Sequence, residues 1–507
     1  MRFIVIEKGA ELPGYVGRFI ALIADKWDDH GFVTMFRSVL VDGGAAYYEL
    51  GQVKIAFQRQ ETGVPTWSQL PSEFEVLPAR FFSLGVSVEY YEEISKLSSP
   101  MKDEYLMGLR DVVAFKEILN RAVVEEVFNT SLLRGVSLGS VRSQYRRVLR
   151  GGDVHVGYAF CYVGESRDGL THIQLDFDVS SESLPPSNIH AIIGRNGVGK
   201  TTVLNAIVQA VRRNVPPCLY QRDWRGIRPL YANYFSGAVL VSFSAFDPFE
   251  PPVEQIEQNA GAFIHYIGLK ASIGYEGALK SRERLRVEFC ESLLECLKDN
   301  QKKLRWLNAI QTLESDENFK EVGLVDLIGM EGPVLDQQAR QKFWSLSSGH
   351  AIVLLSITKL VEAVEEKTLV LIDEPEGHLH PPLLSAFVRA LSDLLSDRNG
   401  LAILATHSPV VIQEIPRSCV WKVDRRGEAI SAIRPDVETF GENVGVLTRE
   451  VFGLEGADTG YRALLAAAVA EGLNYHEIMN RFDGCLGHEA RAVLRALISN
   501  RDSRGWA

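Results

Sequence analysis

The sequence has few cysteines, and their spacing does not pair them. Six cysteines lie far apart among 507 residues, and none forms a C-x-x-C pair. Disulfide frameworks and zinc sites need closely placed or regularly spaced cysteines, whereas isolated thiols are typical of reducing compartments. We therefore expect reduced thiols in a cytoplasmic protein. The six residues are Cys161, Cys218, Cys290, Cys296, Cys419 and Cys485.

Long apolar runs and a surplus of positive charge are also absent. No run approaches the ~18 apolar residues that cross a bilayer, and the charged residues within 1–8 come too early for a signal peptide. The net charge of −11 gives no overall basic field that would attract nucleic acid or an anionic membrane. We expect no membrane contact, while a local basic surface for DNA remains open.

The length and composition predict a folded protein of several domains. A chain of 507 residues exceeds one compact core, and 46% hydrophobic with 23% charged residues is ordinary for globular proteins. Residues 1–150 are predicted to form an α+β accessory domain. Its strand-like segments 31–36 and 47–55 flank the turn signal at 42–44, and helical spacing follows over 87–148.

A phosphate-binding loop follows the apolar run 189–193. Residues 194–201 read Gly-Arg-Asn-Gly-Val-Gly-Lys-Thr and match G-x-x-x-x-G-K-[ST]. Glycines let backbone N–H groups face an anion, Lys200 can reach the β- and γ-phosphates, and Thr201 can ligate Mg²⁺. The expected nucleotide-binding residues here are Gly194, Asn196, Gly197, Gly199, Lys200, Thr201 and Thr202.

Two acids end a second apolar strand, predicted over 368–373. Charged side chains at the carboxyl end of a buried strand lie where α/β sheets bind ligands. Asp373 can hold Mg²⁺ together with Thr201, and Glu374 can orient or deprotonate the attacking water. The alternative is a pair of acids that merely caps the strand.

Two further motifs have ordinary structural explanations when they are taken alone. Ser347 and Ser348 can cap the apolar helix predicted over 351–364. His407 follows the strand predicted over 401–405, where a histidine is often a structural hydrogen-bonding group. Both motifs follow the phosphate loop, one before and one after the acidic strand. This order favours a functional role over a purely structural one.

Together the four motifs resemble the ABC ATPase superfamily over residues 154–435. Leu346-Ser347-Ser348-Gly349-His350 is similar to the Leu-Ser-Gly-Gly-Gln signature, with Ser348 and His350 departing from it. The resemblance implies ATP and Mg²⁺ as cofactors and hydrolysis of ATP. It also implies an ATP-sandwich homodimer or higher homo-oligomer, in which Ser347 and Gly349 contact the γ-phosphate held by a second copy. The implied catalytic residues are Lys200, Glu374 and His407.

The predicted fold class is α/β. An ABC-type ATPase domain over 151–435, with a mixed-sheet P-loop core and a helical insertion at about 250–345, follows the α+β domain and precedes a helical segment over 436–507. Two elements of the resemblance stay unassigned. The glutamine loop has only Gln255 and Gln258 as distant candidates. The aromatic residue that stacks on adenine has three candidates, which are Tyr158, Phe160 and Tyr162.

Residues 374–381, Glu-Pro-Glu-Gly-His-Leu-His-Pro, narrow the resemblance. They are similar to the soluble RecF, overcoming-lysogenization-defect and Septu-type anti-phage ATPases, as are segments 441–443 and 452–454 more loosely. This implies an ATP-driven switch in an anti-phage defence complex that regulates an effector or nuclease partner. Glu376, His378 and His380 fit a dimer-contact loop better than a metal site.

Two other functions remain open. A DNA-repair or chromosome-handling ATPase would need DNA on the basic run over 282–305, although its interleaved glutamates favour a solvated helix face. A nuclease site would need the acidic cluster of the N-terminal domain, for which surface acids are the default explanation. That cluster comprises Asp25, Asp28, Asp29 and His30.

Overall fold

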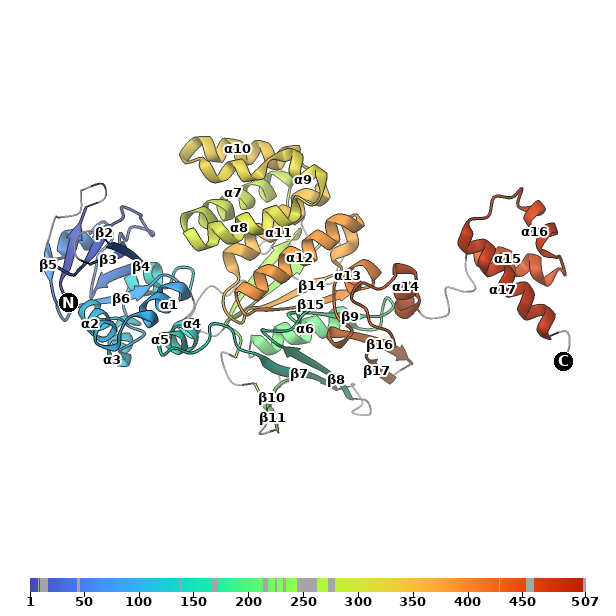
Figure 1. Ribbon diagram of the computed structural model, residues 1–507, viewed down its shortest axis with the longest axis horizontal. Coiled ribbons are helices and arrows are strands. Elements are labelled where there is room, and N and C mark those ends of the chain that lie inside the picture. Colours follow the sequence, from blue (N-terminus) through green and yellow to red (C-terminus); the bar gives the residue numbers. More distant parts are fainter. Residues whose placement is uncertain are drawn as a thin grey trace.

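The structure is a computed structural model with three parts along the chain (Figure 1). It describes residues 1–507 except 8, 10–16, 43–45, 137, 166–171, 213–217, 224–225, 231–233, 244–261, 272–278, 428, 453–459 and 505–507. The turn glycines at 43–44, Gln255, Gln258 and the end of the 452–454 segment therefore lie outside the described residues. Within the described residues, no helix is long and apolar enough to span a bilayer.

The N-terminal part has a six-stranded sheet with the order β5-β1-β2-β3-β4-β6. β1 and β2 are parallel, and the other neighbours are antiparallel. The strand predicted over 31–36 is displaced, because the ladder begins only at Met35. The strands are β1 (Phe3–Ile6), β2 (Phe19–Ala24), β3 (Met35–Asp42), β4 (Ala46–Phe57), β5 (Glu73–Phe74) and β6 (Phe81–Gly85).

Short helices cover this sheet. Aromatic side chains dominate the core between them, and Tyr91 and Tyr105 are fully buried there. The helices are α1 (Val88–Lys96), α2 (Ser99–Leu109), α3 (Lys116–Ala122), α4 (Leu138–Ser140) and α5 (Arg146–Leu149), with short turns at Thr66–Gln69, Phe128–Leu132 and Val141–Tyr145.

The central part is built on a seven-stranded sheet with the order β13-β12-β14-β15-β9-β16-β17. Every pair is parallel except β16 with β17. The apolar runs around the motifs become its innermost strands, because strands covered on both faces carry few polar side chains. The strands are β9 (Ile189–Ile193), β12 (Gly237–Ser242), β13 (Phe263–Gly268), β14 (Leu369–Asp373), β15 (Leu401–Thr406), β16 (Val420–Arg426) and β17 (Ala429–Ile433).

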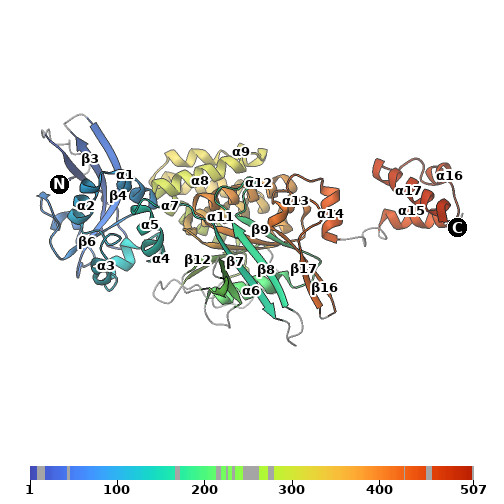
Figure 2. The same cartoon turned by 60° about the horizontal axis from the view of Figure 1, so that its bottom comes forward.

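Helices cover one face of this sheet, and a helix with a second sheet covers the other (Figure 2). Successive side chains of β14 alternate between the two cores, with Val370 in one and Leu371 in the other. The second sheet is antiparallel, in the order β11-β10-β7-β8. The elements on its side are β7 (Tyr158–Glu165), β8 (His172–Val179), α6 (Lys200–Val211), β10 (Leu219–Asp223) and β11 (Gly226–Pro229).

Among the described residues, the helices of the predicted insertion begin later than expected. Residues 263–268 form β13 at the sheet edge, and the helices start at Arg282. A segment of only six residues is too short for its periodicity to distinguish a buried strand from a helix. The helical layer contains α7 (Arg282–Lys298), α8 (Asn300–Leu313), α9 (Glu317–Val322), α10 (Gly332–Ser345), α11 (Ser348–Ala363) and α12 (Pro381–Asp397).

The remaining helices follow the central sheet. α13 (Pro409–Gln413) and α14 (Val444–Phe452) pack against each other. The last three helices, α15 (Tyr461–Ala470), α16 (Tyr475–Arg481) and α17 (His488–Arg504), share a small core of their own around Leu465 and Leu494. They stand apart from the other two parts in both views (Figures 1 and 2).

Candidate functional site

The phosphate loop connects β9 to α6 and depends on its glycines. Gly194, Gly197 and Gly199 have φ angles of +156°, +81° and +105°, which side-chain-bearing residues rarely adopt. A Cβ atom on Gly194 would also lie 2.4 Å from the carbonyl oxygen of Val423. The sequence therefore fixes a tight turn at the carboxyl edge of the sheet, followed by the N-terminus of α6.

Lys200 lies inside this loop. Its side chain is buried, and its Nζ donates to the carbonyl oxygens of Gly194 at 3.0 Å and Arg195 at 3.3 Å. Asn196 and Thr202 are exposed at the rim of the loop. The ammonium group is thus held where a phosphate anion can replace the two carbonyl oxygens as its partner.

Thr201 and Asp373, the two residues predicted to hold Mg²⁺, are in contact. The Thr201 hydroxyl donates to Asp373 Oδ2 at 2.8 Å, and Asp373 is 1% exposed at the end of β14. A hydroxyl and a carboxylate oxygen are the hard ligands that Mg²⁺ accepts next to nucleotide phosphates. The two residues therefore fit the magnesium position expected beside the phosphate loop.

Glu374 has a constrained backbone. Its φ and ψ angles are +43° and +61°, and its N–H donates to the carbonyl oxygen of Ala405 on β15 at 2.9 Å. Non-glycine residues in this left-handed region cluster at functional sites. The side chain is partly exposed, and its Oε1 lies 3.7 Å from His407 Nδ1. The structure thus brings Glu374, predicted to act on the attacking water, next to His407, which the resemblance implies as a further catalytic residue.

Glu376, which the resemblance places in a dimer-contact loop, also lies in this site. Its Oε1 accepts bonds from the Thr406 hydroxyl and the His407 N–H, both at 2.7 Å, and lies 3.2 Å from His407 Nδ1. The side chain is mostly buried. Glu376 therefore holds the turn that presents His407. In the sequence, Glu376 is distinguished only as the third acidic residue of the segment that begins with Asp373 and Glu374.

Ser347 caps the helix that follows the signature. Its Oγ accepts a long bond from the His350 N–H at 3.4 Å and lies 2.6 Å from His350 Nδ1. Ser347 is exposed, whereas Gly349 is buried within the first turn of α11. An exposed serine at a helix N-terminus suits a contact with an anion from outside the chain.

The residues considered for a metal site at 376–380 do not meet in that combination. Glu376 faces His407, whereas His380 Nε2 lies 3.2 Å from Asp316 Oδ2 in the helical layer. The His378 side chain lies outside the described residues. The trio of Glu376, His378 and His380 is therefore not a metal centre, because two of its members point to different partners.

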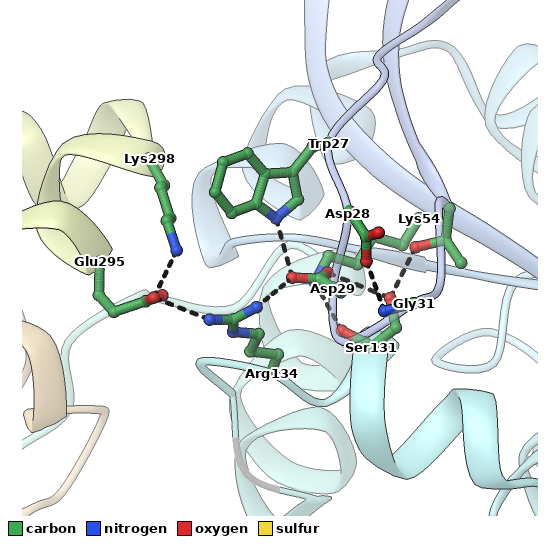
Figure 3. A network of polar contacts seen from close by, with 10 residues as sticks. Trp27, Asp28, Asp29, Gly31, Lys54, Ser131, Arg134, Glu295 and Lys298 are labelled. Atoms are coloured by element: carbon green, nitrogen blue, oxygen red, sulfur yellow. Dashed lines mark hydrogen bonds and ion pairs between the residues drawn. The ribbon is translucent and has the colours of Figure 1, made fainter. Parts of the chain in front are cut away.

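Asp29, one residue of the acidic cluster in the N-terminal part, is buried and neutralised by neighbouring cations (Figure 3). Asp29 is 2% exposed, and its carboxylate contacts Lys54 Nζ at 2.8 Å, Arg134 at 2.7 Å and the Trp27 indole N–H at 2.9 Å. Burial acts to raise the pKa of Asp29, but Lys54 and Arg134 outweigh it and hold this pKa below its ordinary value. Such a carboxylate stabilises the fold and does not resemble a nuclease metal ligand.

The same arginine joins two parts of the molecule (Figure 3). Arg134 also pairs with Glu295 of α7 at 2.8 Å, and Lys298 of α7 lies 4.3 Å above the Trp27 ring. These contacts connect the N-terminal part to the helical layer of the central part.

The basic run over 282–305 is largely paired within the protein. Arg282 donates to the Trp344 carbonyl, Lys302 to the Glu362 carbonyl, and Arg305 pairs with Glu89 and Asp397. Cations held in this way give a weak DNA-binding surface. The adenine-stacking candidates are buried too, at 9% exposed or less, and offer no open ring face. They are Tyr158, Phe160 and Tyr162.

Two comparisons relate this chain to known proteins. The chain is 45% identical over 521 residues to protein ea59 of Escherichia phage lambda, and the match covers 99% of each. The profile of a family described as "AAA domain, putative AbiEii toxin, Type IV TA system" matches residues 220–413, which include Ser347, Asp373 and His407. The predicted α/β class is confirmed, because the central sheet is parallel and layered with helices.

Likeness to solved structures is distant. The SMC head domain from Thermotoga maritima is 14% identical with a TM-score of 0.28, and the match covers 55% of this chain and 99% of that one. A nucleotide-free ATP-binding cassette from an ABC transporter is 13% identical with a TM-score of 0.30, over 55% and 92% of the two chains.

Proposed function

We propose that this chain, which belongs to the same family as protein ea59 of phage lambda, is an ATP-hydrolysing switch in which two copies enclose ATP. One feature carries the proposal. The buried Lys200, the Thr201–Asp373 pair and the Glu374–His407 pair lie at the carboxyl ends of the parallel strands β9, β14 and β15. Ligands bind at this edge in α/β sheets.

Each group has a distinct role in this proposal. The backbone of the phosphate loop and Lys200 bind the β- and γ-phosphates, while Thr201 and Asp373 would hold Mg²⁺, which supplies positive charge to the phosphate oxygens. Glu374 accepts a proton from the attacking water or orients it, and His407, fixed by Glu376, donates toward the γ-phosphate.

A second copy completes the site. The exposed Ser347 and the N-terminus of α11 provide hydrogen-bond donors for an anion. If they serve the γ-phosphate of the other copy, ATP joins the two copies and hydrolysis removes that link. Nucleotide state then sets the fraction of dimer, because a ligand shifts an equilibrium toward the state that it binds better.

The dimer would regulate an effector or nuclease partner in anti-phage defence. The match to a toxin–antitoxin family description and the phage origin of the relative support a role in conflict between phages and their hosts. A partner under this control should co-purify preferentially with one nucleotide state. Affinity purification of the Glu374→Gln and Lys200→Ala variants from infected and uninfected cells, followed by mass spectrometry, tests this role. A partner set identical for both variants contradicts it.

Light scattering tests the switch itself. With ATP and Mg²⁺, Glu374→Gln should bind without turnover and double in mass, whereas Lys200→Ala should stay at its nucleotide-free mass. Two exposed residues supply matched controls, Glu182→Gln and Lys26→Ala, which should behave as the unaltered protein. Equal masses for Glu374→Gln and Lys200→Ala under saturating ATP contradict the proposal.

A further inference from the structure

Three potential metal ligands converge in the helical layer. Asp316 precedes α9, His350 lies in the first turn of α11, and His380 precedes α12. His350 Nε2 is 3.1 Å from Asp316 Oδ1, and His380 Nε2 is 3.2 Å from Asp316 Oδ2. One donor atom from each side chain lies within 4.8 Å of the other two.

We propose that Asp316, His350 and His380 bind one divalent transition-metal ion of the zinc type. Two imidazole nitrogens and one carboxylate oxygen form a ligand set that Zn²⁺ favours, with water as the fourth ligand. Bonds of about 2.0–2.2 Å to these ligands require only small movements from separations of this size. The ion would join three segments that are distant in sequence.

Neighbouring groups already orient two of the three ligands. Asp316 accepts bonds from the N–H groups of Asn318 at 3.0 Å and Phe319 at 3.2 Å. His350 Nδ1 lies 2.6 Å from the Ser347 hydroxyl, which leaves Nε2 directed at the carboxylate. Partners of this kind fix the ring tautomer and orientation of metal-bound histidines.

Two of the three ligands are shielded from solvent, and the third is accessible to it. The Asp316 and His350 side chains are 6% and 8% exposed, and the Phe319 ring lies 5.3 Å from the His350 ring. The His380 side chain is 45% exposed. An ion and its water can therefore reach the site past His380 while the other two ligands stay buried.

One existing contact has to change on binding. His380 Nδ1 accepts a long 3.4 Å bond from the Leu383 N–H. Coordination through Nε2 places the remaining proton on Nδ1, so the half-exposed ring must turn away from Leu383. Without an ion, both Nε2–H groups would donate to Asp316, and the three residues would form a hydrogen-bonded tether. This tether is the alternative that the experiment excludes.

The ion would also act on the signature serine. With the metal on Nε2, His350 carries its proton on Nδ1 and donates it to the Ser347 oxygen. The Ser347 hydroxyl proton is then free for an outside acceptor. This consequence rests on the role proposed above for Ser347, whereas the metal site itself does not.

Metal titration of the full-length protein tests the site without nucleotide. After removal of metals with a chelator, isothermal titration with Zn²⁺ should show one tight site per chain. Co²⁺ at the same site should show the intense visible absorption of four-coordinate cobalt. Because ATP is absent, a failure of the ATPase proposal does not affect this result.

His380→Gln is the decisive variant, since a half-exposed side chain can change without unfolding the protein. It should weaken Zn²⁺ binding by more than the ~10–100-fold that loss of an outer hydrogen-bond partner costs. Asp316→Asn should do the same. Two controls, Cys485→Ser at the exposed thiol and His476→Gln at an exposed histidine, should bind as the unaltered protein does. Absence of stoichiometric binding, or binding that His380→Gln leaves unchanged, overturns the proposal in favour of the hydrogen-bonded tether.

Discussion

The Thr201 hydroxyl donates a 2.8 Å hydrogen bond to Asp373 across 172 residues of sequence. Strands β9 and β14 place these residues at one edge of the sheet, with β15 between them. The pair therefore marks the position where a magnesium ion would join the phosphate loop to the acidic strand.

Asp373→Asn should uncouple nucleotide binding from Mg²⁺. The amide keeps the shape and one oxygen but loses the negative charge that a hard cation requires. We expect ATP hydrolysis to fall by about 100-fold or more. Mg²⁺ should also no longer strengthen ATP binding in a titration by calorimetry. The exposed Asp178→Asn is the matched control, and an unchanged Mg²⁺ dependence in Asp373→Asn would refute this assignment.

Glu376→Ala should slow turnover more than it weakens ATP binding. The change removes the shared acceptor of the Thr406 hydroxyl and the His407 N–H, so His407 loses its fixed position. We expect kcat to fall about 10–100-fold with a smaller change in KM.

Glu376→Gln separates positioning from charge. Its amide oxygen can still accept both bonds, so most of the turnover lost in Glu376→Ala should return. Steady-state ATPase kinetics of the two variants measures this difference. Equal losses in both would show that the charge of Glu376, and not its two hydrogen bonds, matters.

Several features of the site follow from the sequence for a local reason. The phosphate loop and Asp373 each adjoin an apolar strand, and the carboxyl ends of parallel strands share one edge of a sheet. A motif that directly follows an apolar strand can therefore be placed at the carboxyl edge of the sheet from the sequence alone. The layered α/β class follows from the same alternation of strands and helices.

Other features depend on contacts between distant segments and leave little local signal. Glu376 is recognised only when its bonds to Thr406 and His407 are seen, 30 and 31 residues later. From the sequence alone, Asp29 is expected to be a surface acid. Only the structure shows that Lys54 and Arg134 lie next to it. In the same way, β13 is too short to be distinguished from a helix.

Arg134→Lys should loosen the junction between the N-terminal part and α7. The arginine contacts Asp29 through one nitrogen and Glu295 through another, and a lysine ammonium cannot reproduce this fork. Because Lys54 still neutralises Asp29, we expect a loss of about 1–2 kcal/mol of unfolding free energy rather than the larger cost of an unpaired buried charge.

Two measurements check the junction. Chemical denaturation gives the loss of stability, and limited proteolysis should show faster cleavage between the two parts in Arg134→Lys. Lys298→Met removes the cation above Trp27 and its ion pair with Glu295 within α7, but keeps both contacts of Arg134, and should have a smaller effect. Cleavage at an unchanged rate in Arg134→Lys would show that this ion pair does not hold the junction.

His190 should make the central part sensitive to acid. Its ring is 1% exposed in β9 and packs against Phe177, and burial, aided by the positive charge of Arg434, lowers its pKa to about 3. The unfolded chain takes up a proton near the ordinary pKa of about 6.5, while the folded chain does not. The unfolded state therefore binds more protons between these two values, and stability falls as pH falls through that window.

Replacing the ring by a group that does not titrate tests this argument. In His190→Gln, the unfolding free energy relative to the unaltered protein should rise by about 1.4 kcal/mol for each pH unit below about 6.5. Between about pH 7.5 and about pH 5, the difference in unfolding free energy between His190→Gln and the unaltered protein should thus increase by about 2 kcal/mol. Chemical denaturation at the two pH values measures this increase. The buried Asp111, whose pKa burial raises to about 6, acts in the opposite direction but is present in both proteins and cancels from the comparison. A His190→Gln difference that stays constant with pH would contradict this argument, because it would mean that His190 takes up its proton equally readily in the folded and the unfolded protein.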